Sequence, residues 1–205
     1  MKDLRDARIL VTAFDAWEGN PVNASQIAVD GLDGQVIGGC LIRVLHLPVE
    51  FDEAPRRLLE EIASVEPSAI VCFGMQKSSE WKVELLAHNR DVREGEECSI
   101  VDGAPYVLPS GLPVAAVLGK LLDAGLPALP SEDAGVFLCN HAFYWTMHAV
   151  SEGAAPAISG FVHVPAVDMR EGADGARECK NADTLQEGAR LVLEAVAAAV
   201  GRWSD

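Results

Sequence analysis

The sequence has little cysteine, and its cysteines are not arranged in pairs. Five are spread along the 205 residues, an odd number with no CxxC motif: Cys40, Cys72, Cys98, Cys139 and Cys179. A disulfide framework uses an even number of cysteines, and a zinc site uses closely spaced ones. The pattern excludes both kinds of site, and unpaired cysteines indicate a reducing cytoplasm.

Positive charge and long apolar runs are also scarce. The chain has 16 Lys and Arg residues against 31 Asp and Glu residues, a net charge of -15, and no basic stripe. A nucleic-acid partner is therefore not expected. No apolar run reaches the roughly 18–20 residues that cross a membrane, and the N-terminus lacks the apolar core of a signal peptide. We expect a cytoplasmic globular protein that does not enter a membrane.

Phosphate-binding and metal-binding motifs are absent from the sequence. No G-x-G-x-x-G or G-x-x-x-x-G-K-[ST] follows an apolar run, and Gly38 and Gly39 lie inside a predicted strand. His141 and His148 lie on one predicted helix without a third obvious ligand. The sequence therefore predicts neither a nucleotide cofactor nor a catalytic metal.

Apolar runs alternate with segments of helical period. Strands are predicted at 8–14, 35–47, 68–74 and 157–164, with a mixed run at 81–88. Helices are predicted at 23–32, 49–65, 112–124, 136–150 and 183–200, the last capped by Asp183 or Thr184. The polar segment 90–109 reads as an ordered excursion. This alternation predicts one domain over residues 1–205, a three-layer α/β/α sandwich with a largely parallel, mixed central sheet.

Functional groups in such a fold gather beyond the carboxyl ends of the strands, where Phe14, Gly74 and His163 are predicted to lie. Cys139 follows Ser131, Asp133 and Gly135, whose residue types favour helix N-caps. A cysteine in the first turns of a helix meets backbone N–H groups that favour a thiolate, the form that acts as a nucleophile. The alternative is a small core residue, because free cysteine is often buried.

Two further residues carry similar alternatives. His163 in GFVHVPAV is a buried core histidine or a base for Cys139. Glu84 in WKVELLAHN is a solvent-facing strand residue or a carboxylate that orients His163. Taken alone, none of the three residues decides between its two interpretations.

Four motifs, in order along nearly the whole chain, resemble the pyroglutamyl peptidase I family, also called pyrrolidone carboxyl peptidases. ILVTAFDAWEGNPVNAS resembles the family's VTGFxPFGGxxxNPS, and VELLAHN resembles its I-E-R-V-A-I-N. DAGVFLCNHAFYW resembles AGTYVCNxxxY, and GFVHVPAV resembles F-x-H-x-P. The resemblance implies the family's α/β fold and removal of an N-terminal L-pyroglutamyl residue from peptides, without a cofactor.

The resemblance also implies roles for individual residues. Cys139 would be the nucleophile, His163 the general base and then acid, and Glu84 the residue that orients the imidazole. Arg93 falls near the family arginine that helps to stabilise the oxyanion, with Arg90 as its competitor. The substrate pocket is expected to include Phe14, Trp17, Asn23, Met75 and Gln76. The alternative role of Asn23 is helix capping.

The sequence departs from the family pattern in the expected pocket. Ala13 replaces a glycine, AWEG at 16–19 replaces PFGG with Trp17 and Glu18, and Met75 stands where the family has a ring-binding Gln. The stretch MQKSSEWK replaces a glycine-rich one. Alternatives to a pyroglutamyl peptidase are therefore a cysteine amidase or peptidase of the same fold with another N-terminal specificity, and a non-catalytic binding relative. The resemblance further implies a homo-oligomer, a dimer or a tetramer.

Overall fold

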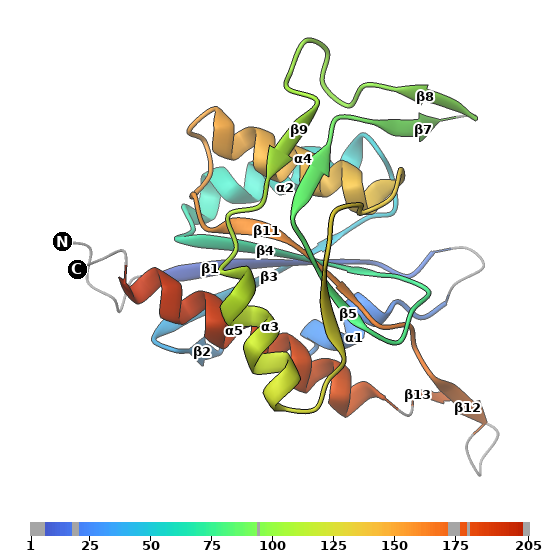
Figure 1. Ribbon diagram of the computed structural model, residues 1–205, viewed down its shortest axis with the longest axis vertical. Coiled ribbons are helices and arrows are strands. Elements are labelled where there is room, and N and C mark those ends of the chain that lie inside the picture. The colour runs from blue at the N-terminus through green and yellow to red at the C-terminus, as the bar shows by residue number, and fades with distance from the viewer. Residues whose placement is uncertain (1–6, 18–20, 94, 172–176, 180, 203–205) are drawn as a thin grey trace.

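The computed structural model describes residues 7–17, 21–93, 95–171, 177–179 and 181–202 (Figure 1). Seven strands form its central sheet. In spatial order they are β10 (Ala128–Ser131), β5 (Trp81–Glu84), β11 (Ser159–Val164), β4 (Ala69–Met75), β1 (Arg8–Phe14), β3 (Cys40–Leu47) and β2 (Val36–Ile37). Neighbouring strands are parallel except for β5 against β11 and β2 against β3. The predicted mixed, largely parallel sheet is confirmed.

The middle strands are apolar because both of their faces are covered. In β1 every residue after Arg8 is buried, and in β4 every residue before Met75 is buried. Parallel strands covered on both sides have continuous runs of aliphatic residues rather than an alternating pattern. The runs RILVTAF and AIVCFGM fit this rule, which is why the sequence alone identified both strands.

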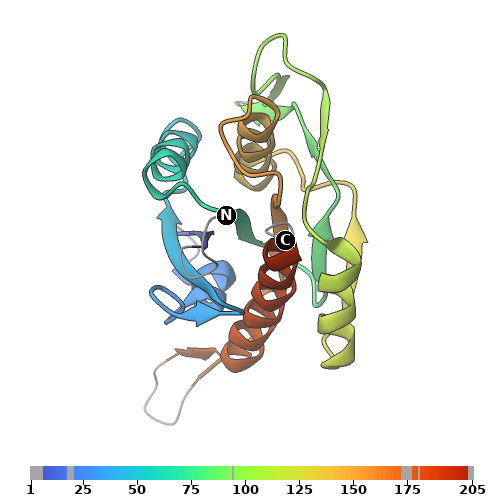
Figure 2. The same cartoon turned by 90° about the vertical axis from the view of Figure 1, so that its left-hand side faces the viewer.

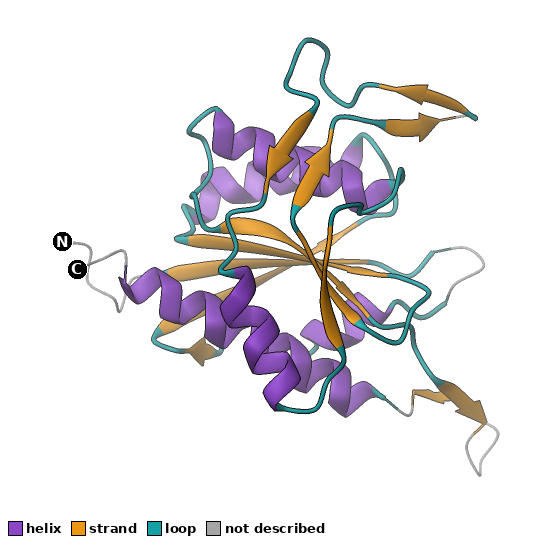
Figure 3. Ribbon diagram, in the orientation of Figure 1, coloured by secondary structure: helices purple, strands orange, loops and turns teal. Residues whose placement is uncertain are grey.

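Helices cover the two faces of the sheet (Figure 3). One layer contains α1 (Ala24–Val29), α3 (Val114–Asp123) and α5 (Ala182–Arg202), and the other contains α2 (Glu53–Val65) and α4 (Leu138–Ser151). Figures 1 and 2 show the α2–α4 layer above the sheet and the other layer below it. Each layer has its own hydrophobic core, and the three-layer prediction is confirmed.

Among the described residues, three short antiparallel strand pairs lie outside the central sheet. They pair β6 (Leu86–His88) with β9 (Val107–Pro109), β7 (Asp91–Arg93) with β8 (Glu96–Cys98), and β12 (Met169–Glu171) with β13 (Arg177–Cys179). Strands β7, β8 and β9 lie in the excursion predicted at 90–109, and β6 lies in the mixed run predicted at 81–88. The excursion lies beside α4 at the top of Figure 1. Asn89 holds it together: its amide donates to the Val101 carbonyl at 2.8 Å and its Oδ1 accepts from two backbone N–H groups.

Two predictions from the sequence were wrong in detail. The strand predicted at 35–47 is a hairpin of β2 and β3, because Gly38 and Gly39 both have positive φ angles, 55° and 85°, and form its turn. Helix α5 begins at Ala182, so Asp183 lies in its first turn rather than at its cap. Within the part of the chain that the structure describes, no helix is long and apolar enough to span a membrane.

Candidate active site

Cys139 is the second residue of α4, so the prediction that it lies in the first turns of a helix is confirmed. The helix begins after Phe137, whose extended backbone ends the preceding loop. Ser131 ends β10, Asp133 and Gly135 lie in that loop, and none of the three caps the helix, so this part of the prediction was wrong. The first N–H groups of a helix have no acceptor within it and carry partial positive charge. The sulfur atom of Cys139 therefore lies where an anion is stabilised.

Gly74 provides the space that this sulfur atom needs. A Cβ atom built on Gly74 would lie 2.9 Å from Cys139 Sγ and 2.6 Å from the ring of Phe161. Any other residue at this position would displace the cysteine or the neighbouring ring. The glycine at the end of the apolar run SAIVCFG is therefore a site residue that our sequence analysis did not assign.

The sheet brings His163 and Glu84 together. His163 pairs with Lys82 across antiparallel β11 and β5, so Glu84, two residues farther along β5, lies on the same face as the histidine. The distance from His163 Nδ1 to Glu84 Oε1 is 2.7 Å, and both side chains are buried. The interpretation of Glu84 as a solvent-facing residue is wrong, because its exposed fraction is 0%.

Burial of the His163 ring works to lower its pKa, but hydrogen bonds to Cys139 and Glu84, together with their negative charges, raise it to about 9. The ring therefore carries a proton at neutral pH. A positively charged imidazole beside a sulfur atom favours the thiolate form. Since Nδ1 faces Glu84, the nitrogen that remains for Cys139 is Nε2.

Cys139 opens into a largely apolar hollow of about 530 Å³, which we call the Cys139 pocket. Phe14, Trp17, Asn23, Met75 and Gln76, the five residues expected in the substrate pocket, all line it. Sequence reasoning missed the other lining residues, which are Val49, Phe51, Lys77, Phe137 and Leu138. Glu18 lies outside the described residues, and Ala13 is fully buried in the core.

Asn23 lies at the N-terminus of α1 and in the wall of the Cys139 pocket. Its Oδ1 accepts from the N–H of Ser25 at 3.0 Å and so caps α1, while the residue also lines the Cys139 pocket. Met75 Sδ accepts from the N–H of Ala24 at 3.5 Å, and the Gln76 amide donates to the Glu80 carbonyl at 3.1 Å. These bonds hold the polar edge of the pocket in place.

The two arginines considered for the oxyanion lie in different surroundings. Arg90 pairs with Asp133 at 3.3 Å. The Arg93 guanidinium lies 4.7 Å from the ring centroid of Phe51, a pocket residue, and also pairs with Asp91 at 3.3 Å. Among the described residues, neither arginine makes a hydrogen bond or ion pair with Cys139. Arg93 is thus the arginine that contacts the wall of the pocket.

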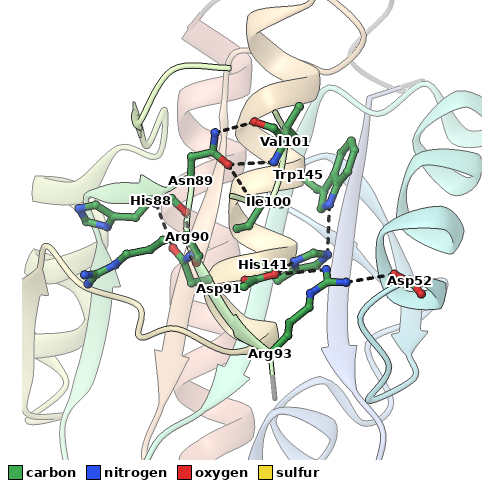
Figure 4. A network of polar contacts seen from close by, with 11 residues as sticks. Asp52, His88, Asn89, Arg90, Asp91, Arg93, Ile100, Val101, His141 and Trp145 are labelled. Carbon is green, nitrogen blue, oxygen red and sulfur yellow. Dashed lines mark hydrogen bonds and ion pairs between the residues drawn. The ribbon is translucent and has the colours of Figure 1, made fainter. Parts of the chain in front are cut away.

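A second buried carboxylate–histidine pair lies beside the site, and the sequence gave no sign of it (Figure 4). His141 Nδ1 lies 2.6 Å from Asp91 Oδ2, and the indole N–H of Trp145 donates to His141 Nε2 at 3.1 Å. The ring of His141 also packs edge-on to Phe51, with centroids 5.3 Å apart. No group of three His, Cys, Asp or Glu residues that could hold a metal ion occurs in the described ranges.

Asn140, next to the nucleophile candidate, fixes the excursion to α4. Its amide donates to the carbonyls of His88 and Arg90, each at 2.8 Å, and its Oδ1 accepts from the N–H of His88. The side chain is completely buried. A buried amide with three hydrogen bonds next to Cys139 sets where β7 lies relative to the helix start. The only sign of this role in the sequence is that Asn140 directly follows Cys139.

The sequence matches one peptidase family over nearly its whole length. The model of the family described as pyroglutamyl peptidase matches residues 7–199. The chain is 35% identical to pyrrolidone-carboxylate peptidase 1 of Ralstonia nicotianae over 195 residues, 91% of each chain. It is 34% identical to the pyrrolidone-carboxylate peptidase of Pyrococcus furiosus over 167 residues, 77% of this chain and 80% of the relative.

Solved structures agree with the sequence match. Pyroglutamyl peptidase I from Bacillus amyloliquefaciens has a TM-score of 0.82 at 27% identity, covering 94% of this chain and 97% of that one. A mutant pyrrolidone carboxyl peptidase from Pyrococcus furiosus has a TM-score of 0.83 at 26% identity, covering 94% and 99%. Sequence, fold and the contacts that bring Glu84, His163 and Cys139 together lead to the same conclusion. This chain belongs to the pyroglutamyl peptidase family of cysteine peptidases.

Proposed function

We propose that this chain removes N-terminal L-pyroglutamyl residues from peptides, with Cys139 as nucleophile, His163 as acid and base, and Glu84 as the residue that orients His163. The observation that carries the proposal is the line of contacts from Glu84 through His163 to Cys139, at the mouth of an apolar pocket. A relative retained only for binding has no need of such an arrangement. Membership of a peptidase family supports the same activity.

The first half of the reaction makes a thioester. The Cys139 thiolate attacks the pyroglutamyl carbonyl carbon, and the carbonyl electron pair moves to its oxygen. When the oxyanion collapses, the C–N bond breaks and protonated His163 gives its proton to the departing amine. Neutral His163 then takes a proton from water, which attacks the thioester, and pyroglutamate and the thiolate are released. Glu84 holds the ring in one orientation through both halves.

The oxyanion is proposed to lie at the start of α4. Backbone N–H groups there are not used inside the helix, since the first intrahelical bond runs from the N–H of His141 to the Phe137 carbonyl. We assign Arg93 as an additional donor because it reaches the pocket wall at Phe51. Removal of one oxyanion donor typically costs about 3–4 kcal/mol in the transition state, so Arg93→Gln should lower kcat more than it raises KM.

The pyroglutamyl ring is proposed to bind in the Cys139 pocket, between the flat apolar side chains of Phe14 and Trp17. Met75 cannot donate a hydrogen bond, and the Gln76 amide already donates to the Glu80 carbonyl. These two residues favour a second candidate function, a cysteine peptidase or amidase of the same fold that accepts a different blocked N-terminus. Both candidates use the same three catalytic residues.

Release of aminomethylcoumarin from pyroglutamyl-coumarin tests the proposal directly. The wild-type protein should release it, Cys139→Ala should not, and Cys98→Ala is the matched control because Cys98 is an exposed cysteine away from the pocket. Turnover by Cys139→Ala would overturn the nucleophile assignment. Turnover of other aminoacyl-coumarins in place of the pyroglutamyl one would favour the second candidate.

Three predictions from the sequence also remain proposals. We propose one domain over residues 1–205, a homo-oligomer of two or four chains, and a cytoplasmic location. The five free cysteines support the reducing compartment, which would keep the Cys139 thiolate active. Light scattering on the purified chain measures its oligomeric state, and a monomer at all concentrations would contradict the second proposal.

A further inference from the structure

A second hollow lies next to the Cys139 pocket and shares one residue with it. Its volume is about 620 Å³, and we call it the Lys77 groove. It is lined by Lys77, Ser78, Ser79, Glu80, Pro165, Ala166, Asp168 and Asn181. Lys77 lines both hollows, so the two border each other at this residue. The groove contains half of the stretch MQKSSEWK, residues 77–80, which the family resemblance did not explain.

The two walls of the groove are tied together by backbone hydrogen bonds. The N–H of Gln76 donates to the Val164 carbonyl at 3.3 Å, and the N–H of Ala166 donates to the Ser78 carbonyl at 2.9 Å. Asn181 then holds the second wall, because its amide donates to the Ala166 carbonyl at 3.0 Å. The groove is therefore formed before any ligand arrives, which reduces the entropy lost on binding.

The position of the groove relative to His163 indicates what enters it. In the proposed reaction His163 gives a proton to the departing amine, so the peptide behind that amine leaves past His163. His163 pairs with Gly74 across parallel β11 and β4, and both strands then run on into the two walls of the groove. The carboxyl ends of these strands are at the right in Figure 1. The ring side of the substrate has the Cys139 pocket, and the leaving side has the Lys77 groove.

The charged residues of the groove differ in whether they also line the Cys139 pocket. Lys77 lies at the junction of the two hollows, is exposed, and has no ion-pair or hydrogen-bond partner for its side chain among the residues that the structure describes. Glu80 and Asp168 line only the groove. A hydrogen bond from the Ser78 hydroxyl, at 2.6 Å, lowers the pKa of Glu80 and keeps it ionised. The cation thus borders the pocket that contains Cys139, and the two anions do not.

We propose that the Lys77 groove binds the leaving part of the substrate and that Lys77 pairs with a carboxylate on the residue after the scissile bond. The inference rests on the proposed function and names its substrate class: short pyroglutamyl peptides that carry a negative charge on this residue. That charge is the terminal carboxylate of a dipeptide or an acidic side chain. The protein has a net charge of -15, which repels anions in general. The unpaired Lys77 supplies a local positive charge that attracts the substrate carboxylate.

Four peptides test the inference. Comparison of kcat/KM for pyroglutamyl-alanine and its amide measures the effect of the terminal carboxylate. Comparison of kcat/KM for pyroglutamyl-glutamate amide and pyroglutamyl-glutamine amide measures the effect of the side-chain carboxylate. We expect a higher kcat/KM, through a lower KM, for at least one of the two charged peptides, by about two- to fivefold at low salt, the size of an exposed ion pair. The preference should fade in about 0.5 M NaCl, because salt screens exposed charges.

Three variants separate local pairing from general charge. Lys77→Gln should abolish the preference for the charged peptide, and Lys77→Arg should keep it. Lys120→Gln makes the same change in net charge at a lysine that pairs with Glu194 between α3 and α5, and should leave the preference unchanged. Pyroglutamyl-coumarin has no carboxylate, so Lys120→Gln, whose residue lines neither hollow, should cleave it as the wild type does.

The outcomes distinguish this inference from the proposed function. If the wild type cleaves pyroglutamyl-coumarin but shows no preference in either peptide pair, or if Lys77→Gln keeps the preference, the Lys77 inference is overturned and the function stands. If the wild type cleaves neither the coumarin nor any of the four peptides, the proposed function fails and the inference fails with it. Equal loss of preference in Lys120→Gln would also overturn the local role of Lys77.

Discussion

The two buried carboxylate–histidine pairs of this protein have the same first contact and different second contacts. In each, the histidine Nδ1 meets a carboxylate oxygen, at 2.7 Å for His163 and Glu84 and at 2.6 Å for His141 and Asp91. In each, the other carboxylate oxygen is buried without a partner among the described residues. The pairs differ at Nε2, which faces Cys139 in one case and accepts from the Trp145 N–H in the other.

That difference assigns a chemical state to each ring. An Nε2 that accepts a hydrogen bond carries no proton, so His141 is neutral and its Nδ1–H donates to Asp91. His163, with Cys139 and Glu84 at its two nitrogens, holds a proton at neutral pH because those groups raise its pKa to about 9. A buried carboxylate–histidine pair is thus suited to catalysis only when its second nitrogen faces a reactive group.

The largest effect should come from replacing the two histidines in turn. His163→Gln should lower kcat/KM for pyroglutamyl-coumarin by about 10²–10⁴-fold, because it removes the acid and base of the reaction. His141→Gln should keep most of the activity, since a Gln amide still donates to Asp91. Steady-state kinetics on both variants, with folding checked by circular dichroism, measures the comparison. Equal losses of kcat/KM in the two variants would mean that the partner of Nε2 does not distinguish a catalytic histidine from a structural one.

Asp91→Asn should have the largest effect on stability. The Asp91 carboxylate is completely buried and serves both His141 and Arg93. Asparagine at this position would weaken the hydrogen bond from neutral His141 and remove the ion pair with the partly exposed Arg93, and a hydrogen bond to a charged group typically contributes about 1.5–3 kcal/mol. Urea unfolding measures this loss. A free energy of unfolding equal to that of the wild type would show that the pair does not hold β7 against α4.

Glu84→Gln should change the pH dependence of the reaction. Because the hydrogen bond and charge of Glu84 help to raise the pKa of His163, their loss lowers that pKa. The wild-type kcat/KM should fall as the pH rises through about 9, where His163 loses the proton that the leaving amine needs. In the variant this fall should occur at lower pH. An unchanged alkaline limb would contradict the role of Glu84.

The raised pKa of His163 also makes the stability of the fold depend on pH. The native state binds the His163 proton more tightly than the unfolded chain, whose histidine has a pKa of 6.5, so the proton stabilises the fold. This contribution is complete below pH 6.5 and is lost as the pH rises through about 9. The stability difference between wild type and His163→Gln should follow this curve in urea unfolding.

Trp145→Phe should give the smallest effect. It removes the N–H that His141 Nε2 accepts and keeps most of the ring packing. A lost hydrogen bond of this kind typically costs about 1 kcal/mol of stability, which urea unfolding can measure. The kcat/KM for pyroglutamyl-coumarin should stay at the wild-type value. A large fall in activity would place the His141 pair in the reaction and remove the distinction between the pairs.

Short sequence motifs predicted part of this site. Cys139, His163 and Glu84 each lie in a segment with a recognisable pattern, and the apolar runs around 8–14 and 68–74 placed two middle strands correctly. The hairpin at Gly38 and Gly39 was missed because alternating residues continue on both sides of the turn. Local pattern identifies an element when its burial is uniform, and it fails where the chain reverses inside the pattern.

The sequence by itself determined the family, the layered fold and the identity of the three motif residues, because each depends on patterns within short segments. Only the tertiary structure decided which groups face one another. Asp91 and His141 are 50 positions apart, and they meet because β7 packs against α4. Lys77 lines two hollows because parallel β4 and β11 end side by side. Such contacts arise from packing between distant segments, which no local pattern records.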